Sequence, residues 1–317
     1  MAQKLNIVFF GTPEFSVPAM DMLHNHPMVN LKYVVTMPDR PAGRGQKLQS
    51  PPVALYAKVH KIPLIQTENI NKEEAFIENL KAEQIDMFVV LAFSQFLSTN
   101  VLDIPKVGPY NIHTSLLPKY RGAAPIQYAL LNGDTYTGVS IQRMVQKMDA
   151  GNIVYSNEVS ISPSENGGQL FTRLKFLAAL GLNDFIENYL SGNYNEEVQD
   201  ESKVSYAPTL KKEMGLLSFS NHNSDEILNR IRAFDPWPGT YFFLEGKRIK
   251  VLNASISSLK LPPGNLLINE EGIFAGTKTQ AIQFQQLQIE GKKPENDTDF
   301  KNRLKNMFPQ QTSWELQ

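Results

Sequence analysis

The chain has 317 residues, none of which is cysteine and only five of which are histidine. Without a thiol there are no disulfide bonds, no zinc–thiolate sites and no thiol nucleophile. The histidines, at positions 24, 26, 60, 113 and 222, are not spaced with carboxylates in the way that zinc sites require. We therefore expect no metal, and the chemistry has to use oxygen and nitrogen groups.

The sequence also lacks an excess of either charge and any long apolar run. It carries 31 basic and 32 acidic side chains, a net charge of −1, so charge alone gives no sign of wholesale nucleic-acid binding. No apolar run approaches the roughly 20 residues that span a bilayer, and residues 1–5 do not form the apolar centre of a signal peptide. We expect a cytoplasmic protein with no membrane partner.

A dinucleotide fingerprint is missing as well. Residues 5–10 form a short apolar run that predicts a strand, and Gly11-Thr12-Pro13-Glu14 follows where such a fingerprint would stand. Thr12 is placed to cap a helix and Pro13 to occupy its first position. Because the Gly-x-Gly-x-x-Gly spacing is absent, we do not expect a nicotinamide cofactor.

What is present is an alternation of short apolar runs and amphipathic segments over the first 190 residues. Apolar and β-branched runs predict strands at 5–10, 31–36, 63–65, 85–91, 137–144 and 153–159. The helical period predicts helices at 53–59, 71–82, 124–131 and 169–190. Strands that alternate with helices indicate a parallel-rich sheet covered on both faces.

The composition changes after residue 190. Residues 191–208 are polar and are interpreted as a linker between domains 1–190 and 209–317. In the second domain a helix is predicted at 224–233 with Ser224 as its cap. Strands punctuated by glycine follow at 240–244, 248–252, 266–268, 272–275 and 281–289, and a closing helix at 301–308. This pattern favours a small β-barrel. Trp237, in the turn 235–239, is expected to anchor the core rather than to stack on a base.

The stretch 108–125 carries the residues best suited to catalysis. Asn111 and His113 lie two apart, so on an extended segment their side chains share a face. They follow the strand predicted at 85–91, and open α/β sheets bind ligands at the ends of such strands. An amide donor beside a titratable imidazole can catalyse addition to a carbonyl, because one polarises the oxygen and the other moves the proton. Such pairs are also common as purely structural features.

A basic loop follows the strand predicted at 31–36. Arg40, Arg44 and Lys47 lie in residues 37–48 together with two prolines and two glycines, a composition that prevents a helix or a central strand. A basic, exposed loop at the end of a strand is well placed to bind a phosphate backbone. A solvated surface loop accounts equally well for its composition.

Taken together, these motifs closely resemble methionyl-tRNA formyltransferases over nearly the whole chain. Residues 111–125, with Asn-Ile-His, Ser-Leu-Leu-Pro and Arg-Gly-Ala-Ala-Pro, are similar to the signature of folate-dependent formyltransferases. The segment Met-Asp-Ala-Gly at 148–151 matches the one that carries the third catalytic residue of that family. Residues 38–45 resemble the loop that enters the acceptor stem of initiator tRNA.

The resemblance implies an α/β protein with a doubly wound, Rossmann-like formyltransferase domain and a smaller, OB-like β-barrel that holds tRNA. The substrates that it implies are 10-formyltetrahydrofolate, as formyl donor, and methionyl-initiator tRNA, for translation initiation. Asn111, His113 and Asp149 would be the catalytic residues. We expect the protein to act as a monomer.

The binding residues implied by the resemblance fall into two groups. Those expected to contact folate are Phe93, Ser94, Ser115, Leu116, Leu117 and Pro118. Those expected to contact tRNA are Arg40, Arg44, Lys47, Lys211, Lys212, Arg248 and Lys250. Two positions depart from the usual family pattern, because Thr114 stands where glycine is common and Phe93-Ser94 where Tyr-Gly is common.

Several alternatives stay open. A formyltransferase that acts on an amino-sugar nucleotide would share Asn111, His113 and Asp149 without needing the basic loop. An RNA-binding protein with an inactive α/β domain is a further alternative, and the complete Asn/His/Asp set argues against it. Arg121 could brace its loop or bind substrate. Ser115 is interpreted as a turn residue rather than a nucleophile, because no Gly-x-Ser-x-Gly elbow surrounds it.

Overall fold

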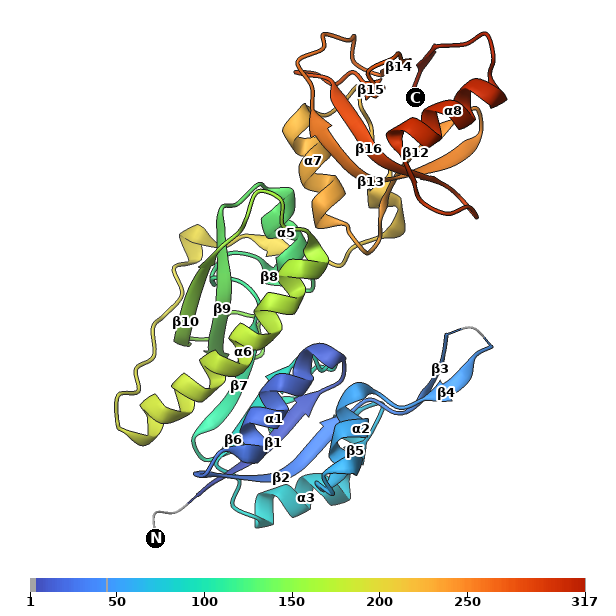
Figure 1. Ribbon diagram of the computed structural model, residues 1–317. Coiled ribbons are helices and arrows are strands. Elements are labelled where there is room, and N and C mark those ends of the chain that lie inside the picture. The colour runs from blue at the N-terminus through green and yellow to red at the C-terminus, as the bar shows by residue number, and fades with distance from the viewer. Residues whose placement is uncertain (1–3, 44, 317) are drawn as a thin grey trace. The chain divides into compact units, whose positions relative to one another are not determined.

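The computed structural model describes residues 4–43 and 45–316, and in them the chain forms two compact units. The first unit contains the residues up to 122, residues 137–159 and residues 171–206. The second contains residues 123–136, residues 160–170 and the chain from 207 on. Each unit has its own seven-stranded sheet (Figure 1).

The sheet of the first unit has the order β10-β9-β7-β6-β1-β2-β5. Its strands are β1 (Leu5–Gly11), β2 (Val29–Thr36), β5 (Leu64–Gln66), β6 (Met87–Leu91), β7 (Gly108–His113), β9 (Tyr136–Arg143) and β10 (Ile153–Ser160). The pairs β2–β5, β1–β2, β1–β6 and β6–β7 are parallel, whereas β9 runs antiparallel to β7. The predicted parallel-rich, Rossmann-like sheet is therefore confirmed.

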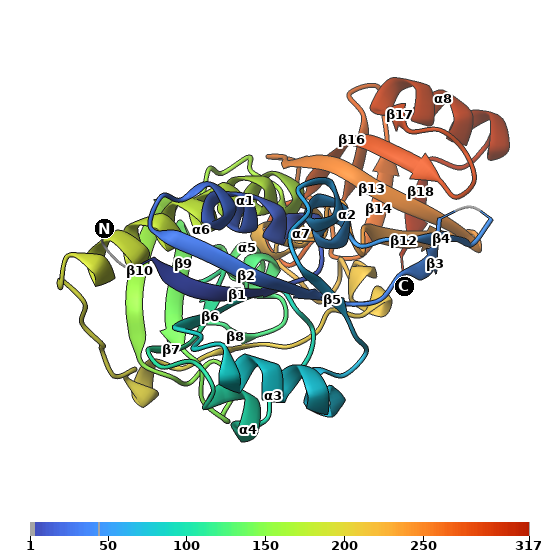
Figure 2. The ribbon, with the colours of Figure 1, turned by 90° about the horizontal axis from the view of Figure 1, so that it is seen from below.

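Helices cover both faces of this sheet. They are α1 (Val17–Asn25), α2 (Pro52–Val59), α3 (Glu74–Ala82), α4 (Thr99–Leu102) and α6 (Gly167–Leu190), with 3₁₀ turns η1 (Glu14–Ser16), η2 (Ile70–Lys72) and η3 (Glu201–Lys203). Figure 2 shows α1, α2 and α6 on one side of the sheet and α3 and α4 on the other. Alternate strand residues such as Val8 and Phe10 pack with Ile77 and Leu80 of α3 in one buried cluster. Strands buried on both faces explain the near-continuous apolar runs in the sequence.

The turn after β1 differs from the prediction. Helix α1 begins at Val17 instead of directly after Thr12, whose hydroxyl donates to the carbonyl oxygen of Phe93 at 3.4 Å. Thr12 is therefore not a helix cap. A Cβ at Gly11 would lie 2.7 Å from the Phe9 ring, so only glycine fits where β1 ends. The hydroxyl of Ser16 donates to the carbonyl oxygen of Leu91 at 2.6 Å, which joins the ends of β1 and β6.

The basic segment 37–48 contains a hairpin of its own. Strands β3 (Arg40–Ala42) and β4 (Lys47–Gln49) pair antiparallel and belong to neither large sheet. The turn between them uses Gly43 and Gly45, which have φ of 68° and 90° and need the freedom of glycine. Arg44 lies outside the described residues.

The second unit is built on an antiparallel sheet of order β12-β13-β16-β15-β14-β18, with β17 also on β16. The strands are β12 (Thr240–Leu244), β13 (Lys247–Ile256), β14 (Asn265–Ile268), β15 (Ile273–Ala275), β16 (Ile282–Ile289), β17 (Glu295–Asn296) and β18 (Ser313–Glu315). The sheet curls into a half-barrel around buried apolar residues, among them the stacked rings of Phe242 and Phe284 (Figure 1). The predicted OB-like barrel is confirmed, and β17 and β18 were not predicted.

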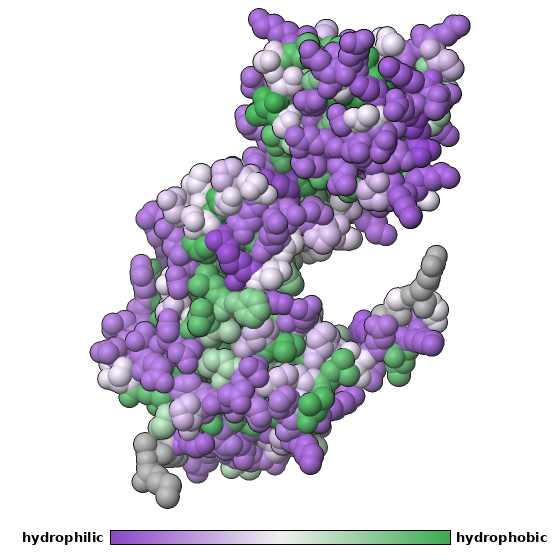
Figure 3. All heavy atoms as spheres, viewed as in Figure 1, coloured by the Kyte–Doolittle hydropathy of each residue, from purple (hydrophilic) through white to green (hydrophobic). Residues whose placement is uncertain are grey.

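The remaining elements are short. They are α5 (Pro125–Leu131), α7 (Ser224–Ala233), α8 (Asp297–Met307), the 3₁₀ turn η4 (Lys212–Gly215), and the paired strands β8 (Arg121–Gly122) and β11 (Tyr206–Ala207). Figure 3 shows that most of the visible surface of the second unit is hydrophilic. Trp237 is nevertheless 50% exposed, so its predicted role as a core anchor was wrong.

Helix α7 is capped by the residue before the predicted cap. The Asn223 side chain accepts from the backbone N–H of Glu226 at 2.8 Å, and the Glu226 carboxylate accepts from the N–H of Asn223, also at 2.8 Å. This reciprocal pair satisfies two of the donors that a helix start leaves free. Ser224, predicted as the cap, is instead buried and its hydroxyl lies 3.0 Å from that of Thr279.

Replacing Asn223 by alanine should destabilise the second unit by about 1 kcal/mol, the usual cost of losing an N-cap. Asn223→Asp should change stability little, because the carboxylate still accepts and also favours the helix start. Both tryptophans, Trp237 and Trp314, lie in the second unit, so tryptophan fluorescence during urea unfolding reports on this unit. Equal destabilisation by both substitutions would contradict the assigned cap.

Candidate active site

The candidate site lies where the parallel strands of the first unit end. In the strand register Leu91 of β6 stands beside Gly11 of β1, and Asn111 of β7 stands beside Val90 of β6. Asn111 and His113 share one face of β7, as predicted from their spacing. The antiparallel neighbour β9 places Gln142 directly opposite Asn111. The chain then returns through the turn that carries Asp149.

His113 is 6% exposed, and a backbone carbonyl determines its tautomer. Its Nε2 lies 2.8 Å from the carbonyl oxygen of Tyr120. Because a carbonyl oxygen only accepts, Nε2 must carry the proton. Nδ1 faces the Oδ2 of Asp149 at 3.7 Å, which suits an ion pair when the ring is charged but is too long for a direct hydrogen bond. The hydrogen bond to the Tyr120 carbonyl therefore accounts for the tautomer of His113 without a direct hydrogen bond from Asp149.

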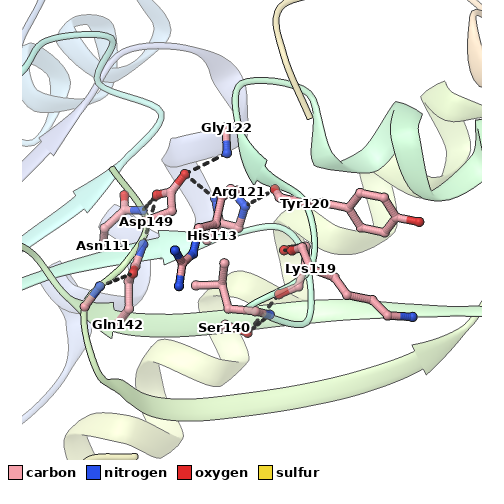
Figure 4. A network of polar contacts seen from close by, with 12 residues as sticks. Asn111, His113, Lys119, Tyr120, Arg121, Gly122, Ser140, Gln142 and Asp149 are labelled. Atoms are coloured by element: carbon pink, nitrogen blue, oxygen red, sulfur yellow. Dashed lines mark hydrogen bonds and ion pairs between the residues drawn. The ribbon is translucent and has the colours of Figure 1, made fainter. Parts of the chain in front are cut away.

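Asp149 is held by neutral donors (Figure 4). The backbone N–H of Gly122 donates to its Oδ2 at 2.8 Å, and the Gln142 amide donates to its Oδ1 at 2.9 Å. The Asn111 amide approaches the same Oδ1 only to 3.5 Å, so it keeps donor capacity for another group. The structure thus brings together the three residues predicted to be catalytic.

The turn after β7 is closed by its own polar groups. Ser115 is fully buried, and its hydroxyl donates to the carbonyl oxygen of Lys119 at 2.6 Å. The hydroxyl of Ser140 accepts from the N–H of Leu117 at 3.0 Å and donates to the carbonyl oxygen of Ser115 at 2.8 Å. These contacts support the interpretation of Ser115 as a turn residue. Leu116 and Pro118 are half-buried in the same turn.

The other predicted folate residues, Phe93 and Ser94, follow β6 and differ in exposure. Phe93 is 2% exposed and packs edge-on against Phe10 with 5.4 Å between ring centres, whereas Ser94 is exposed. Ala92 and Ser94 have φ of 50° and 64°, in the left-handed region that residues other than glycine seldom adopt. Strained backbone of this kind clusters at ligand sites. Whether these residues bind folate stays a prediction.

Arg121 is 1% exposed and braces the loop rather than facing solvent. Its Nη2 donates to the Gln199 Oε1 at 2.8 Å and to the Glu201 Oε1, also at 2.8 Å. Of the two roles left open for Arg121, these contacts favour the structural one. They also connect the loop to residues 191–206, a stretch expected to be a linker and here packed against the first unit.

Two residues of the network, Gln142 and Gln199, were missed from the sequence. Val139 and Ile141 of β9 point to one side of the strand, and Ser140 and Gln142 to the other, yet all four are buried. A polar pair on a strand flanked by apolar residues was a signal for Gln142. Gln199 carried no such signal, because it lies in a polar stretch that resembles a linker.

A second polar network supports the same region. Arg143 donates through Nε to the Glu196 Oε1 at 2.7 Å and through Nη2 to the hydroxyls of Tyr110 and Tyr194, each at 3.1 Å. Burial raises the pKa of Glu196, but hydrogen bonds from Arg143, Tyr194 and Asn152 outweigh burial and lower that pKa to about 2. This network fixes residues 194–196 to β9.

The described basic residues predicted to meet tRNA are all partly or fully exposed. Arg40 and Lys47 project from the β3–β4 hairpin, and Arg40 forms a surface ion pair with Glu68 at 3.0 Å. In the second unit, Lys211 precedes η4 and Lys212 begins it. Arg248 and Lys250 lie on the outer face of β13, as predicted from their alternation. The guanidinium of Arg248 stacks 3.8 Å above the Tyr241 ring.

Residues 4–43 and 45–316, which the structure describes, contain neither a cluster of metal-binding side chains nor a helix suited to span a membrane. Within these ranges there is no group of three or more His, Cys, Asp or Glu side chains arranged to bind a metal ion. No helix among the same residues is both long enough and apolar enough to cross a membrane.

Comparison with known families identifies the family of the chain. The family model described as formyl transferase matches residues 5–186, and the model described as formyl transferase, C-terminal domain, matches residues 209–305. This chain belongs to the formyl transferase family. It is 40% identical to the methionyl-tRNA formyltransferase of Geobacter sulfurreducens over 290 residues, which cover 91% of this chain and 90% of that protein. With the methionyl-tRNA formyltransferase of Thermotoga maritima the identity is also 40%, over 300 residues and 94% and 95% of the two chains.

More distant solved structures share the fold. An N-formyltransferase of Helicobacter canadensis, solved with folinic acid and dTDP-3-aminofucose, is 19% identical and superposes with a TM-score of 0.64 over 89% of this chain and 99% of that one. HypX of Aquifex aeolicus in complex with tetrahydrofolic acid is 14% identical, with a TM-score of 0.59 over 98% of this chain and 48% of that one.

In this formyl transferase, Glu196→Gln should lower the melting temperature of the first unit at pH 7, and the difference from wild type should shrink as pH falls from about 4.5 toward 2. The pKa of Glu196 is lowered on folding, so its stabilisation, on the order of 2–3 kcal/mol, is present above the unfolded pKa of about 4.5 and is lost as pH falls through the folded pKa of about 2. Calorimetry at pH 7 and pH 3 measures both differences. Glu197→Gln, at an exposed neighbour, is the matched control, and a difference that stays constant with pH would contradict the assignment.

Proposed function

We propose that this protein transfers the formyl group of 10-formyltetrahydrofolate to the α-amino group of methionyl-initiator tRNA, as a monomer in the cytoplasm. The observation that carries the proposal is the meeting of Asn111, His113 and Asp149 at the carboxyl ends of the parallel strands, in a chain about 40% identical to methionyl-tRNA formyltransferases over more than nine-tenths of its length. In open α/β sheets this edge is where ligands bind.

The reaction needs a donor for an oxyanion and a carrier for a proton. The amine attacks the formyl carbon, a C–N bond forms, and the carbonyl electrons become a tetrahedral oxyanion. On collapse the bond from the formyl carbon to the folate nitrogen breaks, and a proton passes from the incoming amine to that nitrogen. The Asn111 amide, bound only weakly to Asp149, is free to donate to the oxyanion.

The geometry of His113 supports Nδ1 as the ring nitrogen that moves the proton. Because Nε2 of His113 already donates to the Tyr120 carbonyl, Nδ1 is the nitrogen that can accept a proton from the amine. The Asp149 carboxylate, 3.7 Å from Nδ1, stabilises the imidazolium that forms. No covalent intermediate is required.

Acceptor recognition is assigned to the exposed basic residues on each unit. The surface ion pair of Arg40 with Glu68 contributes little to stability, so the Arg40 guanidinium is available to a phosphate. On the outer face of β12 and β13, Arg248 and Lys250 stand beside Tyr241 and the 51% exposed Phe243. Basic side chains next to exposed aromatic rings suit a nucleic-acid backbone and its bases.

The deciding experiment compares three acceptors in the presence of 10-formyltetrahydrofolate: methionyl-initiator tRNA, methionyl-elongator tRNA and an amino-sugar nucleotide. Transfer to the initiator tRNA alone supports the proposal. Turnover with the sugar alone would keep the chemistry and replace the acceptor. No transfer to any of the three would favour the RNA-binding alternative.

Asn111→Ala should lower kcat about 100- to 1000-fold, the usual cost of removing one oxyanion donor, and leave both KM values nearly unchanged. His113→Ala should abolish transfer, because the proton then has no carrier. Single-turnover formylation with excess enzyme measures the residual rates. A raised KM with an unchanged kcat would place Asn111 in substrate binding and contradict the oxyanion role.

Arg40→Ala should raise the KM for tRNA severalfold, spare the KM for folate, and reduce the slope of log KM against log salt concentration by about 1, as expected for one lost phosphate contact. Lys106→Ala is the matched control, because Lys106 is an exposed cation just before β7, at the opposite ends of the parallel strands. A KM for tRNA that does not depend on salt would refute an electrostatic role for the hairpin.

A further inference from the structure

Two buried glutamines surround the turn that carries Asp149. We propose that Gln142 and Gln199 are positioning residues, which together hold the turn of residues 149–151, with Asp149 in the left-handed region, and direct the Asp149 carboxylate toward His113. The inference rests on the proposed function, since it concerns the same carboxylate. The contacts that support it are independent of any substrate.

Gln142 binds both the side chain and the backbone of the turn. It is 2% exposed, its Nε2 donates to the Asp149 Oδ1 at 2.9 Å, and its Oε1 accepts from the N–H of Gly151 at 3.2 Å. Only one orientation of the amide works, because exchanging its oxygen and nitrogen would set an acceptor against the carboxylate and a donor against an N–H. The position of Gln142 on β9 is set by its pairing opposite Asn111.

Gln199 binds the two carbonyls of the same turn. It is 6% exposed, and its Nε2 donates to the carbonyl oxygens of Asp149 at 2.9 Å and Gly151 at 2.7 Å. Its Oε1 accepts from the Nε and Nη2 of Arg121 at 3.1 and 2.8 Å. This amide also has one workable orientation, because its oxygen faces a guanidinium that only donates. Arg121 therefore holds Gln199, and Gln199 holds the turn.

The turn needs this support because of its conformation. Asp149 has a φ of 50°, in the left-handed region that residues with a Cβ rarely adopt unless their surroundings impose it. At Gly151 an added Cβ would lie 1.7 Å from the carbonyl oxygen of Arg143, so the turn approaches β9 too closely for any side chain. The two glutamines satisfy the N–H of Gly151 and both carbonyls in this cramped geometry.

Charge explains why amides suit these two positions. The donors to Asp149 among the described residues are uncharged: the amides of Gln142 and Asn111 and the N–H of Gly122. The guanidinium of Arg121 is paired with Glu201 instead. Neutral donors orient the carboxylate without neutralising it, so its charge stays available to His113, its only ion-pair partner in the described chain.

The test is a double-mutant cycle with Asp149→Asn. Gln142→Met, which keeps the side-chain volume and loses the hydrogen bonds to Asp149 and Gly151, should lower kcat about 10- to 100-fold, the usual effect of removing a supporting hydrogen bond, and leave both KM values unchanged. In the Asp149→Asn background the same substitution should cost almost nothing, because no carboxylate remains to be directed. Single-turnover formylation of the methionyl-tRNA by the full-length protein measures all four rates.

A second variant and a control complete the cycle. Gln199→Met should show the same dependence on Asp149, so the test survives if Gln142→Met fails to fold. Gln283→Met is the matched control, because its amide donates to the backbone oxygen of Glu271 at 3.1 Å in the second unit and should leave kcat unchanged. Equal losses in both Asp149 backgrounds, a loss confined to KM, or no loss would each overturn the proposal.

Hydrogen exchange separates this proposal from the proposed function. The N–H of Gly151 donates to Gln142, so its exchange with solvent should become faster, by about tenfold or more, in Gln142→Met. If the wild-type protein transfers no formyl group, the proposed function fails, and the exchange rate still tests the turn. An unchanged exchange rate would show that Gln142 does not hold it.

Discussion

The antiparallel pairing of β9 with β7 is the constraint on which the site depends. It places Gln142 opposite Asn111 and, through the turn that follows β9, brings Asp149 within reach of His113. The parallel pairing of β6 and β7 brings the loop after Leu91 to the same edge. These two strand pairings therefore bring together side chains from segments nearly 60 residues apart, and the loops after the strands supply the remaining groups of the site.

The charged side chains around the site have partners of two kinds: the two arginines pair with acids, whereas Asp149 accepts hydrogen bonds from neutral groups. Arg121 and Arg143 are both substantially buried, and each is paired with an acid of the segment 194–201, Glu201 and Glu196 respectively. Burying an unpaired guanidinium would be costly, so these pairs fix the polar segment to the sheet. Asp149 receives neutral donors and faces Nδ1 of His113 at 3.7 Å. The segment interpreted as a linker is thereby part of the site.

The second unit is held together mainly by apolar packing. Its half-barrel is filled by apolar side chains from six strands and two helices. The polar side chains of its outer face do not take part in this packing. On that face the guanidinium of Arg248 stacks on Tyr241, which orients a half-buried cation. Side chains on the outer face can therefore be replaced without disturbing the apolar core that holds the strands together.

Several features were predictable because they are local. Apolar runs and helical periods located most strands and helices of the two units to within a few residues, and the spacing of Asn111 and His113 already implied a shared face. The errors lie where two equivalent local signals compete: Ser224 and Asn223 both suit a cap, and the contact with Thr279 removes Ser224 from that role. A tertiary contact also explains the error at Thr12, because its hydroxyl donates to the carbonyl oxygen of Phe93 and does not cap a helix.

The sequence by itself determined the succession of elements, the parallel-rich sheet, the barrel and the residue types available for carbonyl chemistry. Only the tertiary structure decided which distant groups meet: the Tyr120 carbonyl that sets the tautomer of His113, and Gln199, which reaches Asp149 from 50 positions along the chain. It also left Trp237 half exposed. The physical reason is that local pattern specifies which face a side chain occupies, whereas hydrogen-bond partners across a fold depend on strand order and register.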